Sequence, residues 1–207
     1  MNMRELLATV APGLTVARSE LILGGQKSGK SCRAELLARV WLAASPGHNA
    51  LLIATAQACD GEMRARIERH QADRAQYVPG MATVEEPLAL AAAIAHHSHS
   101  NTLVVVDCLT LWLTNVLMPH GDPAEPLPQS ATDAEYAWEL PLATALEHAG
   151  GPVVLVGNEI GLGVIPLGRE ARHFVDALGH LNQRMAQRCA RVTLMAAGLP
   201  LALKDTA

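Results

Sequence analysis

The chain carries at positions 24–31 the sequence Gly24-Gly25-Gln26-Lys27-Ser28-Gly29-Lys30-Ser31, which fits the P-loop pattern G-x-x-x-x-G-K-[ST]. The apolar run Leu21-Ile22-Leu23 before it predicts the end of a buried strand, and the Ala- and Leu-rich segment from residue 32 predicts a helix. A strand that turns through glycines into a helix directs several backbone N–H groups, and the positive end of the helix dipole, at one point. A glycine-rich turn without a ligand is the alternative, and the strand–turn–helix context favours a phosphate site.

The P-loop pattern assigns roles to two side chains. In P-loop proteins the lysine reaches the β- and γ-phosphates, and the hydroxyl that follows it binds Mg²⁺. We therefore predict that Lys30 contacts a nucleoside triphosphate and that Ser31 is a ligand of the metal ion.

The rest of the chain alternates between strand and helix patterns. Further strands are predicted at 50–55, 103–106, 152–156 and 192–195, and helices near 31–44, 61–74, 87–97, 133–149 and 168–190. All but the last of these strands are continuous apolar runs, as in a parallel sheet covered on both faces. The alternation predicts an α/β fold with a mostly parallel sheet flanked by helices. Gly198-Leu199-Pro200, between two short apolar runs, predicts a C-terminal hairpin.

Composition limits the class of protein. The 207 residues suit a single domain, which we assign to 20–207 after an N-terminal extension at 1–19. The net charge of −4 gives no argument for nucleic acid or for an anionic membrane, and no apolar run is long enough to span a bilayer. Glu5, Pro12 and Gly13 interrupt the extension, which argues against a signal peptide. The four cysteines form no C-x-x-C pair and predict reduced thiols of a cytoplasmic protein.

Asp107 follows the apolar run 103–106. An acid at the carboxyl end of a buried strand, after a P-loop strand, is the Walker-B arrangement that holds Mg²⁺. A helix N-cap is the alternative. Because open α/β sheets bind ligands at the carboxyl ends of their strands, we predict Asp107 to be a metal ligand.

The segment after the second strand predicts a helix with a charged row of Glu62, Arg66 and His70 at i, i+4 spacing. Met63 and Ile67 form a separate row that we expect to pack inward. His70 therefore lies on the charged strip, where both a solvated surface histidine and a catalytic one stay open.

Three further features are less specific. Residues 158–166, with Gly161 and Gly163, predict a tight backbone path beside a ligand or a partner. Arg169 and Arg172 begin the next helix, where they either meet phosphate or pair with acids. His96, His97 and His99 fit a polar loop better than a metal site, since no cysteine or carboxylate stands at ligand spacing.

Several separate blocks match one known family. They are the P-loop with its leading Gly-Gly pair and residues 53–57, 62–70, 83–88, 107–110, 113–115, 158–166 and 171–183. With this ordered set the chain resembles the bifunctional adenosylcobinamide kinase/adenosylcobinamide-phosphate guanylyltransferase family of cobalamin biosynthesis, from Leu21 to about Lys204.

The resemblance implies a P-loop NTPase-type, RecA-like α/β domain that forms trimers. It implies phosphorylation of adenosylcobinamide by ATP or GTP, followed by transfer of GMP from GTP to adenosylcobinamide phosphate. The histidine at the position of His70 attacks the α-phosphate of GTP and carries GMP as a covalent intermediate. The nucleotide contacts of the family carry over to Gly24, Gly25, Gln26, Lys27, Ser28, Gly29, Lys30, Ser31, Thr55, Ala56, Gln57, Gln71, Ala72, Asp73, Arg74, Glu85 and Asp107.

Two other functions are compatible with a P-loop. One is a single-activity kinase that acts on another small alcohol without a covalent nucleotide intermediate, and the other is a non-catalytic nucleotide-binding switch. The helix that carries His70 and the loop 158–166 argue against both, because neither function requires them.

Overall fold

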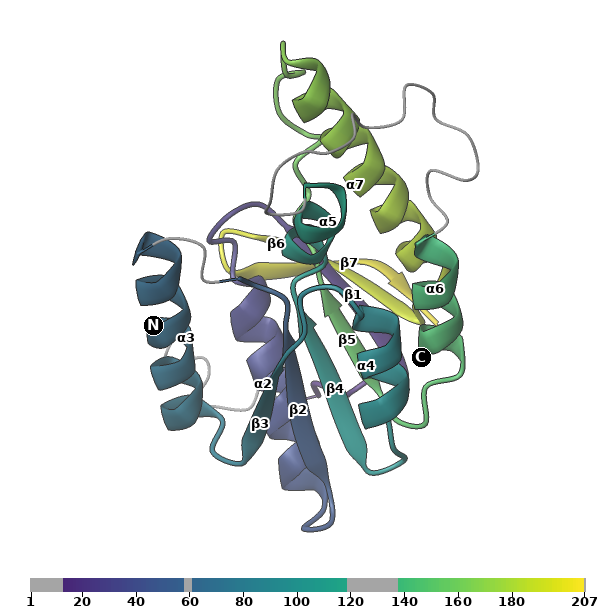
Figure 1. Cartoon of the computed structure of the whole chain (residues 1–207). Helices are drawn as coiled ribbons and strands as arrows, with labels where there is room; N and C mark the ends of the chain where they lie inside the picture. Colours follow the sequence, from purple (N-terminus) through teal and green to yellow (C-terminus); the bar gives the residue numbers. More distant parts are fainter. Residues whose placement is uncertain (1–12, 58–60, 119–137, 207) are drawn as a thin grey trace.

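Seven strands in the described part of the chain form one sheet with the order β3-β2-β4-β5-β1-β6-β7 (Figure 1). The computed structural model describes residues 13–57, 61–118 and 138–206, without the side chains of Glu62, Met63, Arg66, Ile67 and His70. The strands are β1 (Ser19–Gly24), β2 (Asn49–Ala54), β3 (Met81–Glu85), β4 (Thr102–Asp107), β5 (Val153–Val156), β6 (Arg191–Ala196) and β7 (Leu199–Asp205). Neighbouring strands pair in parallel, except that β7 pairs antiparallel with β6.

Helices cover both faces of the sheet. They are α2 (Lys30–Ala44), α3 (Gly61–Tyr77), α4 (Leu90–His97), α5 (Leu109–Leu117), α6 (Glu139–Glu147) and α7 (Arg169–Arg188). Because alternate residues of a strand point to opposite faces, β1 contributes to two cores. Leu21 and Leu23 pack with α4, α5, α6 and α7, whereas Ile22 packs with α2.

The predicted α/β class and the C-terminal hairpin are confirmed. All five strand segments predicted from apolar runs are present. One face of α7, formed by Ala177, Leu178, Leu181 and Met185, is buried in the core. Where described, Cys32, Cys108 and Cys189 are free thiols, as predicted. Burial raises the pKa of the Cys189 thiol to about 12.

The structure differs from the sequence prediction at two elements. β3 was not predicted, because it is an edge strand with an exposed face and lacks a continuous apolar run. α5 was also not predicted; its nine residues follow β4 almost directly, and Trp112 and Leu113 are buried against the sheet. The helix predicted from residue 87 begins at Leu90. Of the helix predicted at 133–149, residues 133–137 lie outside the described part.

Residues 13–19, which the sequence analysis assigned to an extension, contact the domain. Leu14 and Val16 pack against the α2 side of the core. Arg18 donates hydrogen bonds to the carbonyls of Ala149 and Gly151. Ser19 is already the first residue of β1. Among the described helices, none combines the length and apolar character needed to cross a membrane.

Candidate functional site

The predicted P-loop joins β1 to α2 in the expected conformation. Gly29 adopts φ 104°, in the left-handed region, directly before Lys30 starts the helix. The Ser28 N–H donates to the Gly25 carbonyl at 3.3 Å, which closes the turn. Lys30 is buried, and its Nζ donates to the same carbonyl at 2.7 Å. The lysine therefore lies across the loop, where the phosphates of a P-loop ligand are bound.

Gly24 cannot be replaced without rearrangement. Its φ is +151°, and a Cβ at this position would collide with the Met195 carbonyl oxygen of β6 and lie 2.6 Å from Ser28 Oγ. The turn between β6 and β7 also holds the loop, since the Gly198 N–H donates to the Ser28 carbonyl at 2.9 Å. By contrast, a Cβ on Gly25 would meet nothing within 4 Å in the described structure.

Ser31 and Asp107, the two predicted metal ligands, lie side by side. Ser31 Oγ donates to Asp107 Oδ2 at 2.8 Å, although the residues are 76 positions apart in the sequence. β5 lies between β1 and β4 in the sheet. The contact therefore joins the helix that follows β1 to the end of β4, across one intervening strand. A hydroxyl and a carboxylate are the hard oxygen donors that Mg²⁺ prefers, and one or two protein ligands suffice when phosphate supplies others. The pair therefore fits this ion.

A second carboxylate, that of Glu35, interacts electrostatically with Asp107. Burial raises the pKa of the Glu35 carboxyl on α2 to about 7, Arg74 opposes this shift, and the negative charges of Asp107 and Asp73 add to it. Glu35 thus interacts with the end of β4 and with the C-terminal half of α3 together. Asp73 and Arg74, two of the predicted nucleotide contacts, are half-buried here, whereas Gln71 and Ala72 are exposed.

Position 70 lies one helical turn before Asp73 and Arg74 on α3. Figure 1 shows α3 at the outer edge of the molecule beside β3. The side chain of His70, the predicted nucleophile, lies outside the described part, and so do those of Glu62, Met63, Arg66 and Ile67. α3, the helix that contains position 70, interacts electrostatically with Glu35 of α2 through Asp73 and Arg74.

The remaining predicted contacts lie along the same sheet edge. In the strand register, Ala54 pairs with Glu85 on one side and with Asp107 on the other. Glu85 is exposed, and Ala56 and Gln57, just after β2, are half-buried. The parallel strands therefore bring these separate segments together at one edge.

Thr55 is hydrogen-bonded to other groups of the protein. It is fully buried, and its Oγ1 both donates to the Cys108 carbonyl at 2.7 Å and accepts from the Cys108 N–H at 2.9 Å. Its own carbonyl accepts from Asn115 Nδ2 at 2.8 Å, and its N–H donates to the Asp107 carbonyl at 3.3 Å. These contacts hold Asp107 and Cys108 in position, so we expect Thr55 to act on a nucleotide through Asp107.

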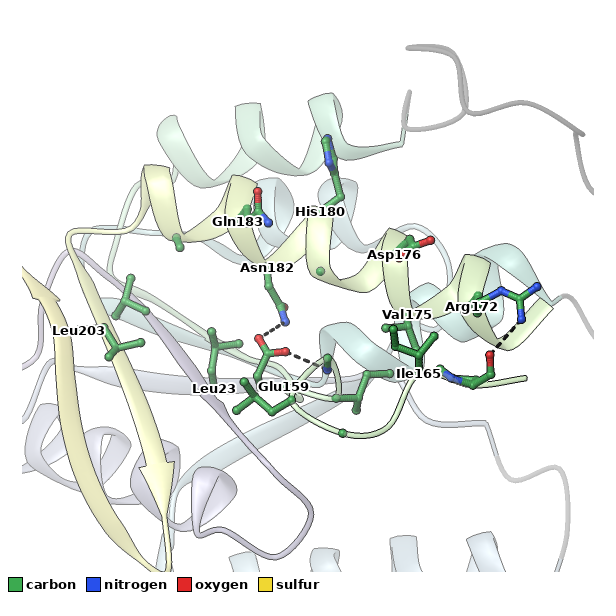
Figure 2. Close-up of a pocket in the computed structure, with 18 of the residues that line it drawn as sticks. Leu23, Glu159, Ile165, Arg172, Val175, Asp176, His180, Asn182, Gln183 and Leu203 are labelled. Atoms are coloured by element: carbon green, nitrogen blue, oxygen red, sulfur yellow. Dashed lines mark hydrogen bonds between the residues drawn. The ribbon is translucent and has the colours of Figure 1, made fainter. Parts of the chain in front are cut away.

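The loop after β5 contacts the P-loop and α7 (Figure 2). The Glu159 N–H donates to the Gly24 carbonyl at 3.2 Å. Glu159 Oε1 accepts from the Gly161 N–H at 3.0 Å, and its Oε2 lies 3.5 Å from Asn182 Nδ2 of α7. Arg172 donates to the carbonyls of Pro166 and Leu167, at 3.0 and 2.5 Å. This arginine therefore stabilises the end of the loop. A cavity of about 890 Å³ lies between the loop, α7 and β6–β7.

The histidine cluster gives no metal site. His96 and His97 pack edge to face with ring centroids 4.7 Å apart. Across the described residues, no group of three or more His, Cys, Asp or Glu is arranged to hold a metal ion. His96 and His97 end α4, whereas the sequence analysis expected them in a polar loop, and His99 lies in the loop before β4.

Comparison with known proteins identifies the family. Residues 20–203 match the family model described as cobinamide kinase/cobinamide phosphate guanyltransferase. This chain belongs to that family. It is 46% identical over 185 residues to the bifunctional adenosylcobalamin biosynthesis protein CobP of Pseudomonas aeruginosa, covering 89% of this chain and 96% of the relative. It is 36% identical over 187 residues to the protein CobU of Escherichia coli, and 34% to CobU of Salmonella typhimurium, covering 89% of this chain and 98% of each relative.

The match to the cobinamide kinase family begins at Glu20 in β1 and ends at Leu203 in β7. Three polar groups of this family member were not singled out from sequence. They are Glu159, Asn182 and the buried Glu20, which accepts from Arg33 Nε at 2.7 Å and from Thr193 Oγ1 at 2.8 Å. Glu20 directly precedes the apolar run Leu21–Leu23 of β1, and this position next to a buried strand segment was the available signal.

Proposed function

We propose that the protein phosphorylates the alcohol of adenosylcobinamide and then transfers GMP from GTP to adenosylcobinamide phosphate, giving adenosylcobinamide-GDP. The observation that carries the proposal is the contact between Ser31 and Asp107 beside the P-loop, in a chain that belongs to the cobinamide kinase family. ATP and GTP are co-substrates, and the phosphoryl donor can be either.

In the kinase reaction the alcohol oxygen attacks the γ-phosphorus, and the bond from that phosphorus to the β–γ bridging oxygen breaks. The hydroxyl proton is released, and the nucleoside diphosphate leaves. Lys30 and the N–H groups of residues 24–31 neutralise the charge that develops on the transferred group. Ser31 and Asp107 would hold Mg²⁺, which supplies charge neutralisation at the phosphates when bound.

In the guanylyltransferase reaction a neutral imidazole nitrogen of His70 attacks the α-phosphorus of GTP, and pyrophosphate leaves. A phosphate oxygen of the corrinoid then attacks the same phosphorus, and the phosphorus–nitrogen bond breaks. Imidazole suits this role, because its unperturbed pKa near ~6.5 leaves the neutral nucleophile available at neutral pH. Asp73 and Arg74, one turn further on α3, interact electrostatically with Glu35, as does Asp107.

Labelling with GTP that carries ³²P at the α-phosphate tests the nucleophile. We expect acid-labile, base-stable label on the wild-type protein, none on His70→Ala, and kinase activity in both. His99→Ala, at an exposed position before β4, is the control and should be labelled fully. Label that persists in His70→Ala would refute the assignment.

A single-activity kinase is the alternative function. It predicts γ-phosphoryl transfer without any covalent nucleotide, so the same experiment separates it from the bifunctional enzyme.

We place the protein in the cytoplasm, where its triphosphate substrates are found, and we propose a homotrimer on the basis of family likeness. Sedimentation analysis would measure the subunit number.

A further inference from the structure

The cavity beside the loop after β5 has a defined relation to the phosphate site. Leu23, a wall residue, is the last residue before the P-loop glycines. Glu159, also in the wall, is hydrogen-bonded through its N–H to the Gly24 carbonyl. The cavity therefore adjoins the P-loop, because Leu23 is bonded to Gly24 and Glu159 is hydrogen-bonded to it. A molecule in the cavity would extend toward the phosphate site from this side.

The walls combine apolar surface with polar groups at the edges. Leu162 and Val164 in the loop are 82% and 96% exposed, which leaves apolar side chains without cover in the described structure. Asp176 and Gln183 of α7 line another part of the cavity (Figure 2). Lys204 of β7 lines it as well. Small-molecule sites typically have this composition, with a mostly apolar lining and a few polar groups that fix orientation.

Gly179 is the residue that most strongly indicates a ligand in the cavity. It lies in the middle of the 20-residue helix α7 and lines the cavity. A glycine in a helix interior is about 1 kcal/mol less favourable than alanine. Packing within the chain does not require it, because a Cβ at Gly179 would meet nothing within 4 Å in the described structure. Because residue 179 has no side chain, the space beside it is left unoccupied by the described residues.

We propose that this cavity binds the corrinoid substrate, with the macrocycle against the loop and α7 and its alcohol arm directed along Leu23 toward the P-loop. The inference rests on the proposed function, and it names the site of the second substrate. A corrin ring has apolar faces and a rim of amide groups, which match exposed leucine and valine side chains next to carboxylate, amide and ammonium groups. The cavity volume of about 890 Å³ is larger than an alcohol arm alone would need.

Filling the cavity from Gly179 tests the proposal without harming the fold, because helix propensity favours leucine and alanine over glycine. We expect Gly179→Leu to weaken binding of adenosylcobinamide about tenfold or more, since the new side chain occupies the space of the ligand. Equilibrium dialysis in the dark, read by the visible absorbance of the corrinoid, measures this. Gly179→Ala should give a smaller effect in the same direction.

The matched control is Gln187→Leu, an exposed position on α7 outside the cavity, and it should bind the corrinoid as the wild type does. Labelling by GTP and the KM for the nucleotide should be unchanged in Gly179→Leu. Equal corrinoid affinity of Gly179→Leu and Gln187→Leu would overturn the cavity assignment, as would a loss of binding that follows a change in subunit number. Wild-type protein that neither binds nor phosphorylates the corrinoid would instead refute the proposed function.

Discussion

Ser31 at the start of α2 and Asp107 at the end of β4 are joined by a hydrogen bond of 2.8 Å. Each residue is supported separately: Ser31 lies in the first turn of a helix whose start is set by Gly29, and Asp107 is held by the contacts of Thr55 with the adjoining backbone. The oxygen pair is therefore preorganised on two rigid elements. Such placement favours metal binding next to the phosphates, because little has to be ordered when the ion arrives.

Asp107→Asn should preserve the fold and reduce catalysis. The amide has the same shape and can still accept the Ser31 hydrogen bond, but it lacks the charge that attracts a divalent cation. We expect kinase turnover at limiting Mg²⁺ to fall about 100-fold, with partial recovery at high Mg²⁺. A magnesium titration of the initial rate, with an unfolding curve for each protein, measures this. Unchanged magnesium dependence would exclude Asp107 as a ligand.

The two leading glycines of the P-loop offer a matched pair. Gly24→Ala should abolish nucleotide binding and lower stability, because its Cβ would collide with the Met195 carbonyl, which is backbone and cannot move aside easily. Gly25→Ala should fold normally, since its Cβ meets open space in the described structure. Nucleotide binding by isothermal titration and thermal unfolding of both variants check the pair. Equal behaviour of the two variants would contradict the geometry.

Four of the strands predicted from sequence lie inside the sheet and are buried by helices on both sides. β1, β2, β4 and β5 give continuous apolar runs, because almost every residue is covered. β3 could not be predicted in this way, since it is an edge strand and three of its five residues are exposed. α5 is short, and its apolar residues could belong equally well to a strand.

Part of the site also followed from sequence. The sequence analysis predicted Ser31 and Asp107 separately as metal ligands, the latter from the rule that ligands bind at the carboxyl ends of parallel strands, and the structure places the two side chains in hydrogen-bond contact. The contacts of Thr55 with Cys108 and the contact of the Glu159 N–H with Gly24 could not be predicted, because they join segments that are far apart in the sequence. A residue pattern does not predict which backbone carbonyl or N–H group a side chain contacts in the folded protein.

Thr55→Val tests the positioning role of this residue. Valine has nearly the same volume, but it leaves the N–H and the carbonyl of Cys108 without the hydroxyl. We expect a loss of about 1–3 kcal/mol in the free energy of unfolding, because a buried group is left unpaired. Urea unfolding measures it, and Thr83→Val on exposed β3 is the control that should be nearly neutral. The variant should also bind Mg²⁺ less tightly, because Asp107 is held less firmly.

Glu20 is a buried carboxylate of β1 that contacts α2, the helix after the P-loop. Its carboxylate accepts from Arg33 and Thr193 and lies 3.5 Å from Arg191. Glu20→Gln removes the charge that compensates two largely buried guanidinium groups, and we expect it to cost about 3–5 kcal/mol of stability. Glu147→Gln, whose carboxylate pairs with Arg188 at the surface, should cost less than about 1 kcal/mol. Denaturant unfolding at pH 7 compares the two, and equal losses would contradict the buried-pair argument.

Glu35 should make stability depend on pH. Burial raises the pKa of its carboxyl from 4.5 to about 7, so between these values the folded protein holds a proton that the unfolded chain has lost. The folded state is therefore favoured at low pH, and the contribution of this group is lost as the pH rises through about 7. Glutamine at this position does not titrate and resembles the protonated form.

We therefore expect Glu35→Gln to gain stability relative to the wild type as the pH increases from about 5 to about 8. Urea midpoints in EDTA, without nucleotide, would show the difference widening across this window. Glu68→Gln, at an exposed position on α3, should give a difference that does not change with pH. A constant difference for Glu35→Gln would mean that the carboxylate stays ionised in the fold, with Arg74 outweighing both burial and the two neighbouring aspartates.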